Sequence, residues 1–222
     1  MYYREMYFFD KERPVKGTIR SYTKGDFSGL IDIQREAFPP PFPPELWWDE
    51  EQLSNHVGFF PEGALCAEIA GELAGSMTGL IVDLAEDDIH HTWAEITDEG
   101  YIRNHNLRGN TLYVVDICVK PSYRKLGIGK WLMHAMYEVV VHKGLKRLLG
   151  GGRIPGYHLV SEKMNAADYL RAVIKGEMQD PVVSFLLRCG RMPIAIVPNY
   201  LDDKESCNYG VLMEWRNPFI FR

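Results

Sequence analysis

The chain has 222 residues, of which 46% are hydrophobic and 25% are charged. This length and composition are typical of one soluble domain with a substantial core. The formal net charge of −5 gives no support for a nucleic-acid partner, which would favour a basic face. Charges interrupt the aromatic residues at the N-terminus and no stretch is long and apolar enough to span a membrane, so we expect neither a signal peptide nor a membrane partner.

The cysteines and histidines indicate a cytoplasmic protein without a metal. The four cysteines form no Cys-x-x-Cys pair and follow no disulfide framework, so we expect reduced thiols at Cys66, Cys118, Cys189 and Cys207. His90 and His91 are adjacent, but no further ligand stands at a metal-binding spacing.

The first part of the chain predicts a strand, two helices and a hairpin after an N-terminal extension at residues 1–16. Asp26 is a suitable N-cap for the first helix, and the prolines of residues 39–44 end it. The two strands of the hairpin turn at Ala70-Gly71-Glu72. The expected elements are a strand at 17–22, helices at 26–38 and 45–57, and strands at 64–68 and 73–82.

Residues 84–110 form a polar insertion between the predicted strands. Trp93 and His105 lie in it, together with the histidine pair. We interpret this insertion as a surface excursion and consider it a candidate for a partial lid over the acceptor.

The second half of the chain predicts a strand, a long amphipathic helix and a parallel strand, joined as a right-handed crossover. The parallel strand ends in Gly150-Gly-Gly152, and such glycines weaken strand pairing and suit the close approach of a ligand. The expected elements are strands at 111–119 and 146–151 around a helix at 129–143, helices at 165–175 and 180–189, and strands at 192–197 and 209–215.

The turn between the central strand and the long helix carries the most informative motif. The strand stops before Pro121, and the segment Arg124-Lys-Leu-Gly-Ile-Gly-Lys130 leads into the helix. The first N–H groups of a helix lack partners and carry the positive end of its dipole, so they bind anions. Glycines let a phosphate approach the backbone, and Arg124, Lys125 and Lys130 add positive charge. We therefore predict a phosphate site here.

The spacing excludes two common phosphate motifs. A Walker loop requires Gly-x-x-x-x-Gly-Lys-Ser/Thr, but Arg124 stands at the first glycine position and Trp131 follows Lys130. A dinucleotide fingerprint requires a third glycine, where this chain has Leu132.

The turn resembles the signature segment of the GCN5-related N-acetyltransferase (GNAT) superfamily. The matching residues are Val119, Pro121, Arg124, Gly127 and Gly129. The resemblance implies an α/β fold over residues 17–222, with a central mixed and partly splayed β-sheet flanked by helices. The tail from Arg153-Ile-Pro-Gly-Tyr157 to Pro218 is similar to the acetyltransferase module that some bacteria fuse to a carbon–nitrogen hydrolase domain.

This resemblance implies an enzyme that moves an acetyl group from acetyl-coenzyme A to a primary amine, by direct attack in a ternary complex. The backbone of Ile117, Cys118 and Val119 would pair with the pantetheine amides, and the N–H groups of the turn would hold the pyrophosphate. The pyrophosphate residues are Arg124, Lys125, Leu126, Gly127, Ile128, Gly129 and Lys130. The resemblance also implies that the acceptor is a small-molecule amine or a protein lysine. It is compatible with a homodimer.

Asp116 is the candidate general base, because a carboxylate inside an apolar strand is costly without a partner or a task. A structural role as a hydrogen-bond acceptor is the equal alternative. Strict alternation along the strand would put Asp116 on the face opposite Tyr113, so at most one of the two is expected to face the acceptor.

The sequence departs from the family at the proton donor for the thiolate. Many members carry a Tyr where this chain has Leu186, four residues before Gly190. We expect Tyr157 to replace it, with His158 and then water as alternatives. The departure also favours a second hypothesis, a coenzyme A-binding sensor without catalysis, and a nucleotide-binding protein is the third.

Overall fold

Eight strands form one mixed sheet in the computed structural model, which describes residues 1–220. The strand order across the sheet is β1-β2-β3-β4-β5-β6-β8-β7, and among these described strands only β5 and β6 run parallel. The strands are β1 (Tyr3–Asp10), β2 (Arg13–Ser21), β3 (Ala64–Ile69), β4 (Glu72–Val82), β5 (Thr111–Val119), β6 (Arg147–Arg153), β7 (Met192–Val197) and β8 (Gly210–Arg216). The helices are α1 (Phe27–Ala37), α2 (Glu50–Phe59), α3 (Trp93–Thr97), α4 (Ile128–His142), α5 (Ala166–Lys175) and α6 (Val183–Arg188).

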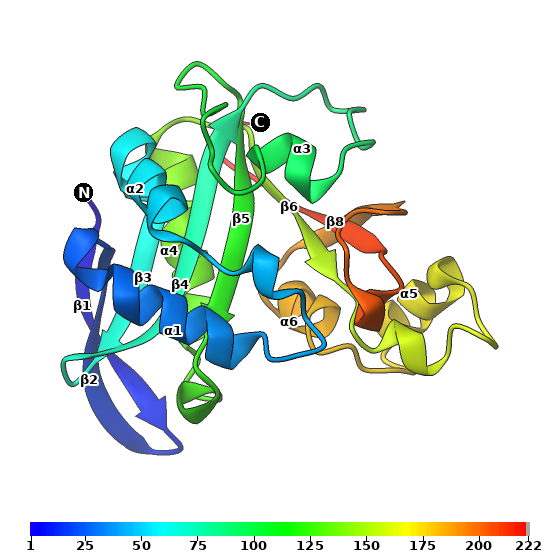
Figure 1. Cartoon of the computed structure of the whole chain (residues 1–222), viewed down its shortest axis with the longest axis horizontal. Coiled ribbons are helices and arrows are strands. Elements are labelled where there is room, and N and C mark those ends of the chain that lie inside the picture. The colour runs from blue at the N-terminus through cyan, green and yellow to red at the C-terminus, as the bar shows by residue number, and fades with distance from the viewer. Residues whose placement is uncertain (221–222) are drawn as a thin grey trace.

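Helices cover both faces of this sheet. In Figure 1, α1 lies in front of β4 and β5, whereas α4 lies behind the same strands. The apolar side of α4 is fully buried, including Leu132, Met136 and Val140, which is the stripe that its sequence predicts. The predicted α/β fold with a mixed, partly splayed sheet and flanking helices is therefore confirmed.

Most predicted elements are present, with two differences near the N-terminus. The expected N-terminal extension instead forms β1 and the first part of β2, which pair from Tyr3↔Arg20 to Asp10↔Arg13. Helix α2 begins at Glu50, later than expected. The side chain of Asp49 accepts a hydrogen bond from the Gln52 N–H and so caps the helix there.

Strands β5 and β6 separate soon after they meet. Their parallel pairing runs from Thr111↔Arg147 to Tyr113↔Leu149 and then stops, while β5 continues to Val119. Beyond Leu149, β6 pairs only with β8 among the described residues. This is the splay that the glycine triplet predicts, and Figure 1 shows the two arrows diverging.

The insertion packs against the rest of the domain. His91, Ile96, Thr97 and Ile102 are buried, which is incompatible with a simple surface excursion. Two hydrogen bonds tie it to α2, from Gln52 Nε2 to the Glu99 carbonyl (2.9 Å) and between His56 Nε2 and the Gly100 carbonyl (2.7 Å). Among the helices that the structure describes, none combines the length and hydropathy needed to cross a bilayer.

Candidate active site

A cavity of about 1130 Å³ opens where β5 and β6 diverge. It extends from the turn before α4, along β5, to the segment between α1 and α2. Ten of the residues that the sequence singles out line it: Asp116, Ile117, Cys118, Val119, Arg124, Lys125, Gly127, Ile128, Gly129 and Lys130.

The turn before α4 has the geometry of an anion cradle. Gly127 is the N-cap of the helix and has φ +79°, a left-handed conformation that favours glycine. Lys125 also has positive φ (+74°), which is strained for a residue with a Cβ. A Cβ on Gly127 would point into open space, with only Trp131 Cδ1 as close as 4.0 Å. The N-terminus of α4 is therefore accessible to a phosphate, as the proposed cofactor requires.

The edge of β5 that faces the cavity has no neighbouring strand over residues 114–119 in the described part of the chain. Its backbone groups on this side have no partner from β6, because the ladder stops at Tyr113. Val114 to Val119 all line the cavity. Free backbone donors and acceptors in a groove can pair with an extended amide-containing ligand as an added strand would. The residues present thus fit a pantetheine chain.

Asp116 lies on this edge with an unsatisfied carboxylate oxygen. Its Oδ2 atom is buried and has no hydrogen-bond partner among the described residues. Burial raises the pKa of Asp116 to about 7, against smaller opposing effects of the Cys118 thiol, the Ile117 backbone and Gln34. A carboxyl group with a pKa near 7 is partly ionised at neutral pH. Its ionised form can accept a proton from a bound ammonium group.

A β-bulge beside Asp116 changes which side chains share a face. Thr78 pairs with Asp116 and Gly79 pairs with Val114, so Val115 has no partner on β4. The side chains of Leu112 and Met136 meet over Gly79, on the α4 side of the sheet.

Val119 also lies on the α4 side, beside Gly129. Leu112 and Val119 are seven positions apart, and strict alternation would put them on opposite faces. The extra residue of the bulge, Val115, therefore brings Tyr113 and Asp116 to the same face of the sheet, away from α4. The expectation that they face apart is wrong, because alternation assumes an uninterrupted ladder.

Tyr157 and His158 are not brought to this cavity. Tyr157 is buried between Tyr169 and Tyr209, with ring centroids 5.5 and 5.7 Å away, and is not among the described lining residues. His158 is exposed, and its Nδ1 faces the carbonyls of Pro155 and Glu205. Leu126 belongs to the cradle turn without lining the cavity, whereas Leu186 does line it.

Cys118 is a packing residue by its contacts. Its thiol lies 3.4 Å from the Ser76 hydroxyl, and burial raises its pKa well above the ordinary value. A thiol held protonated in this way is a poor nucleophile, consistent with direct transfer.

The opposite end of the cavity carries aromatic residues that no sequence motif assigns to the site. They are Phe38 and Phe42 from the segment after α1, Trp48 before α2, and Trp93 of α3. Trp93 Nε1 donates a hydrogen bond to the Val115 carbonyl (2.9 Å), so the insertion holds the bulge in place. Phe38 and Trp48 fall inside the helices predicted at 26–38 and 45–57, and no local pattern connects any of the four residues to the turn before α4, which is why the sequence did not reveal them.

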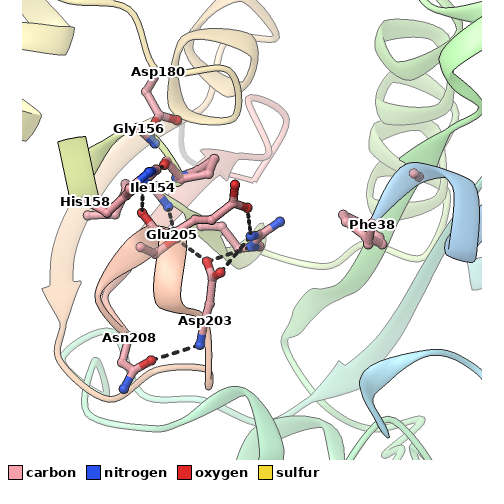
Figure 2. A network of polar contacts seen from close by, with 12 residues as sticks. Phe38, Ile154, Gly156, His158, Asp180, Asp203, Glu205 and Asn208 are labelled. Atoms are coloured by element: carbon pink, nitrogen blue, oxygen red, sulfur yellow. Dashed lines mark hydrogen bonds and ion pairs between the residues drawn. The ribbon is translucent and has the colours of Figure 1, made fainter. Parts of the chain in front are cut away.

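A charged network borders the aromatic end. The Arg153 guanidinium makes two hydrogen bonds to the Asp203 carboxylate (2.7 and 2.8 Å) and one to Glu205 (3.0 Å). It also stacks on Phe42, 4.9 Å from the ring centroid. Figure 2 shows Asp203 and Glu205 in this network, with Phe38 facing them from the other side. The network fixes the loop that bears Glu205, which also lines the cavity.

A mixed sheet that splays beside an anion cradle defines the architecture of the coenzyme A-dependent acyltransferases. The family model described as the acetyltransferase (GNAT) family matches residues 27–152, and the chain belongs to that family. The predicted enzyme class, N-acetyltransferase, is thereby confirmed.

Two curated relatives share much of the sequence. The uncharacterized N-acetyltransferase YkwB of Bacillus subtilis (strain 168) is 59% identical over 216 residues, covering 97% of this chain and 96% of YkwB. The probable hydrolase YhcX of the same organism is 42% identical over 203 residues, covering 91% of this chain but only 39% of YhcX. The second match agrees with the predicted likeness to a module fused to a hydrolase.

A solved structure supports the fold. The GphF GNAT-like decarboxylase in complex with isobutyryl-CoA aligns with a TM-score of 0.75 at 19% identity, covering 89% of this chain and 98% of that chain. At this identity the likeness concerns the fold alone.

Proposed function

We propose that the protein transfers the acetyl group of acetyl-coenzyme A directly to a primary amine. The observation that carries this proposal is the common cavity. It joins the cradle before α4, the free edge of β5 and the unsatisfied Oδ2 of Asp116. Each of these features binds or activates one of the reactants. The transfer that they support together proceeds without a covalent enzyme intermediate.

The cradle and the strand edge hold the donor. Backbone N–H groups from Lys125 to Lys130 bind the pyrophosphate, helped by the charges of Arg124, Lys125 and Lys130. The backbone of Ile117, Cys118 and Val119 pairs with the pantetheine amides. The thioester then lies toward Val114–Asp116, because that part of the strand is farthest from the cradle. The donor supplies an acetyl group activated by its thiol leaving group.

Asp116 prepares the acceptor for attack. An ammonium group cannot attack a carbonyl, so a base must first remove a proton from it. Oδ2 of Asp116 is free to accept that proton. The pKa of about 7 lets the carboxylate accept it near neutral pH and release it again.

The aromatic end suits the remainder of the acceptor. Phe42, Trp48 and Trp93 offer apolar walls, and an ammonium ion is attracted to aromatic faces before it loses its proton. A small amine carried on an apolar group fits these walls better than a highly charged acceptor.

The test is the release of free thiol from acetyl-coenzyme A in the presence of a panel of amines, with mass spectrometry of the products. Acetylated amine with stoichiometric thiol is the expected result. Tight binding of acetyl-coenzyme A without turnover on any amine would instead favour the sensor hypothesis, which Leu186 in the cavity wall supports.

A further inference from the structure

Tyr200 stands at the point where β5 and β6 separate. It lines the cavity, and its hydroxyl lies 2.8 Å from that of Tyr113, the last β5 residue to pair with β6. The Gly151 N–H donates a hydrogen bond to the Tyr200 oxygen (3.2 Å). A Cβ on Gly151 would lie 2.4 Å from this oxygen and 2.1 Å from Cζ, so only glycine leaves room for the phenol. Within the glycine triplet, Gly151 therefore leaves the room that the Tyr200 side chain occupies.

The hydrogen bonds continue from Tyr113 into the insertion. The Tyr113 hydroxyl lies 3.0 Å from Nε2 of His91, which is buried. Nδ1 of His91 has no hydrogen-bond partner among the described residues, and Asp88 Oδ1 is 3.9 Å away, beyond hydrogen-bonding distance. Burial lowers the pKa of His91, so its ring is neutral at pH 7 and only one nitrogen carries a proton.

The unpartnered nitrogen indicates where that proton is. An unpaired buried N–H is rarer in proteins than an under-satisfied acceptor, which favours a bare Nδ1 and a proton on Nε2. Nε2–H then donates to the Tyr113 oxygen, and the Tyr113 O–H donates to Tyr200. Since the Tyr200 oxygen already accepts from Gly151, both of its lone pairs are used. Its own proton is left for the cavity.

Other charges nearby are compatible with this arrangement. Arg191 is buried beside these tyrosines and lines the cavity, and its Nη2 donates to the carbonyls of Gly150 and Met213. Its positive charge stabilises the ionised form of the phenols and by itself lowers the pKa of Tyr113 and Tyr200. Burial nevertheless raises the pKa of Tyr200 to about 12, so the phenol keeps its proton at neutral pH and acts as a donor.

We propose that the Tyr200 hydroxyl donates a hydrogen bond to the leaving sulfur, in the role for which the chain lacks a Tyr at Leu186. Tyr113 and His91 are positioning residues that hold this hydroxyl as a donor. The inference rests on the proposed acetyl transfer. In that step the amine nitrogen bonds to the acetyl carbon, and the carbon–sulfur bond breaks with its electron pair on sulfur. Asp116 already holds the first proton of the ammonium group, and the second proton, lost by the attacking nitrogen, passes to sulfur to give the free thiol. While the sulfur is negative it accepts the hydrogen bond from Tyr200.

The kinetic test compares Tyr200→Phe with Tyr113→Phe and Tyr137→Phe. Tyr137 is the control, because its partly buried hydroxyl donates a hydrogen bond to the Cys189 carbonyl (2.8 Å) but it does not line the cavity. We expect kcat to fall about a hundredfold in Tyr200→Phe and less in Tyr113→Phe, with KM for acetyl-coenzyme A little changed. The Tyr137 variant should keep its kcat. Equal kcat in wild type and Tyr200→Phe would overturn the inference.

A second test needs no substrate. The ¹⁵N spectrum of the His91 ring in the free protein should show a proton on Nε2, and Tyr113→Phe should change that signal. A proton on Nδ1 would overturn the inference, because Tyr113 would then donate to His91 and Tyr200 to Tyr113. These results separate the inference from the proposed function. If wild type acetylates amines and Tyr200→Phe does so equally well, only the inference fails. If wild type acetylates no amine, the proposed function fails, and the inference about the transfer step fails with it.

Discussion

Tyr113 and Leu149 form the last parallel pair between β5 and β6, and the cavity begins immediately beyond them. The separation exposes one edge of β5 without exposing the core, since Tyr113 and Leu149 are themselves fully buried. A fold that left these strands paired to Val119 would have no groove for an extended donor. The end of this short ladder is thus the structural origin of the site.

The cradle can be tested with two glycines in the same conformation. Gly127 and Gly176 have φ +79° and +76°, and a Cβ on either meets open space, but only Gly127 lines the cavity. We expect Ala at either position to cost a similar strain, about 1–2 kcal/mol of unfolding free energy. Only Gly127→Ala should reduce the rise in Tm caused by acetyl-coenzyme A, which stabilises the native state by mass action. An equal rise in both variants would mean that the phosphate binds elsewhere.

Asp116→Asn tests the base. The amide is nearly isosteric but cannot accept the proton of an ammonium group, so kcat should fall about a hundredfold or more. Donor affinity, measured by calorimetry, should stay nearly constant, because the donor contacts β5 through its backbone. Unchanged turnover per folded molecule, together with lost stability, would assign Asp116 a structural role.

The pH dependence follows from the same carboxylate. Its pKa is about 7 in the folded protein and 3.8 in the ordinary case. Between these values the unfolded chain binds fewer protons than the folded chain, so the contribution of Asp116 to stability falls as pH rises from about 4 to about 7. Activity should rise as the pH increases towards 7, because the ionised carboxylate of Asp116 accumulates. Chemical denaturation at pH 5 and pH 8 should show a smaller loss of stability in Asp116→Asn than in wild type.

Tyr157 and Tyr200 are alternative donors to the leaving sulfur, and the two hypotheses predict opposite results for Tyr157→Phe. Tyr157→Phe should leave turnover unchanged, because the ring packs between Tyr169 and Tyr209 rather than facing the cavity. Steady-state kinetics with matched protein concentrations are sufficient. A marked loss of kcat in this variant would restore Tyr157 as the proton donor.

A buried ion pair provides a stability control away from the chemistry. Arg147 and Glu214 are almost fully buried and 3.1 Å apart, and Arg147 also donates to the Ala85 carbonyl of the insertion. Glu214→Gln leaves the guanidinium charge without its partner and should cost about 3 kcal/mol of unfolding free energy. KM for acetyl-coenzyme A should not change, since neither residue lines the cavity. A changed KM with intact stability would contradict this separation.

The sequence by itself determined the parts that depend on neighbours along the chain. The cradle is one such part, because its glycines, basic residues and helix start are consecutive from Arg124 to Lys130. The amphipathic stripe of α4 and the hydrophobic run of β5 are others, since period and length are local properties. The glycine triplet likewise predicted the splay.

Only the tertiary structure decided which distant residues complete the site. The bulge at Val115 depends on pairing with β4, and it reversed the predicted separation of Tyr113 and Asp116. Tyr200 is 87 positions from Tyr113, and no periodicity links the two. Tyr157 lies near the strand end in sequence, but the chain turns there and buries the ring elsewhere. Hydrogen bonds between loops depend on how the sheet brings them together, which no local pattern of residues encodes.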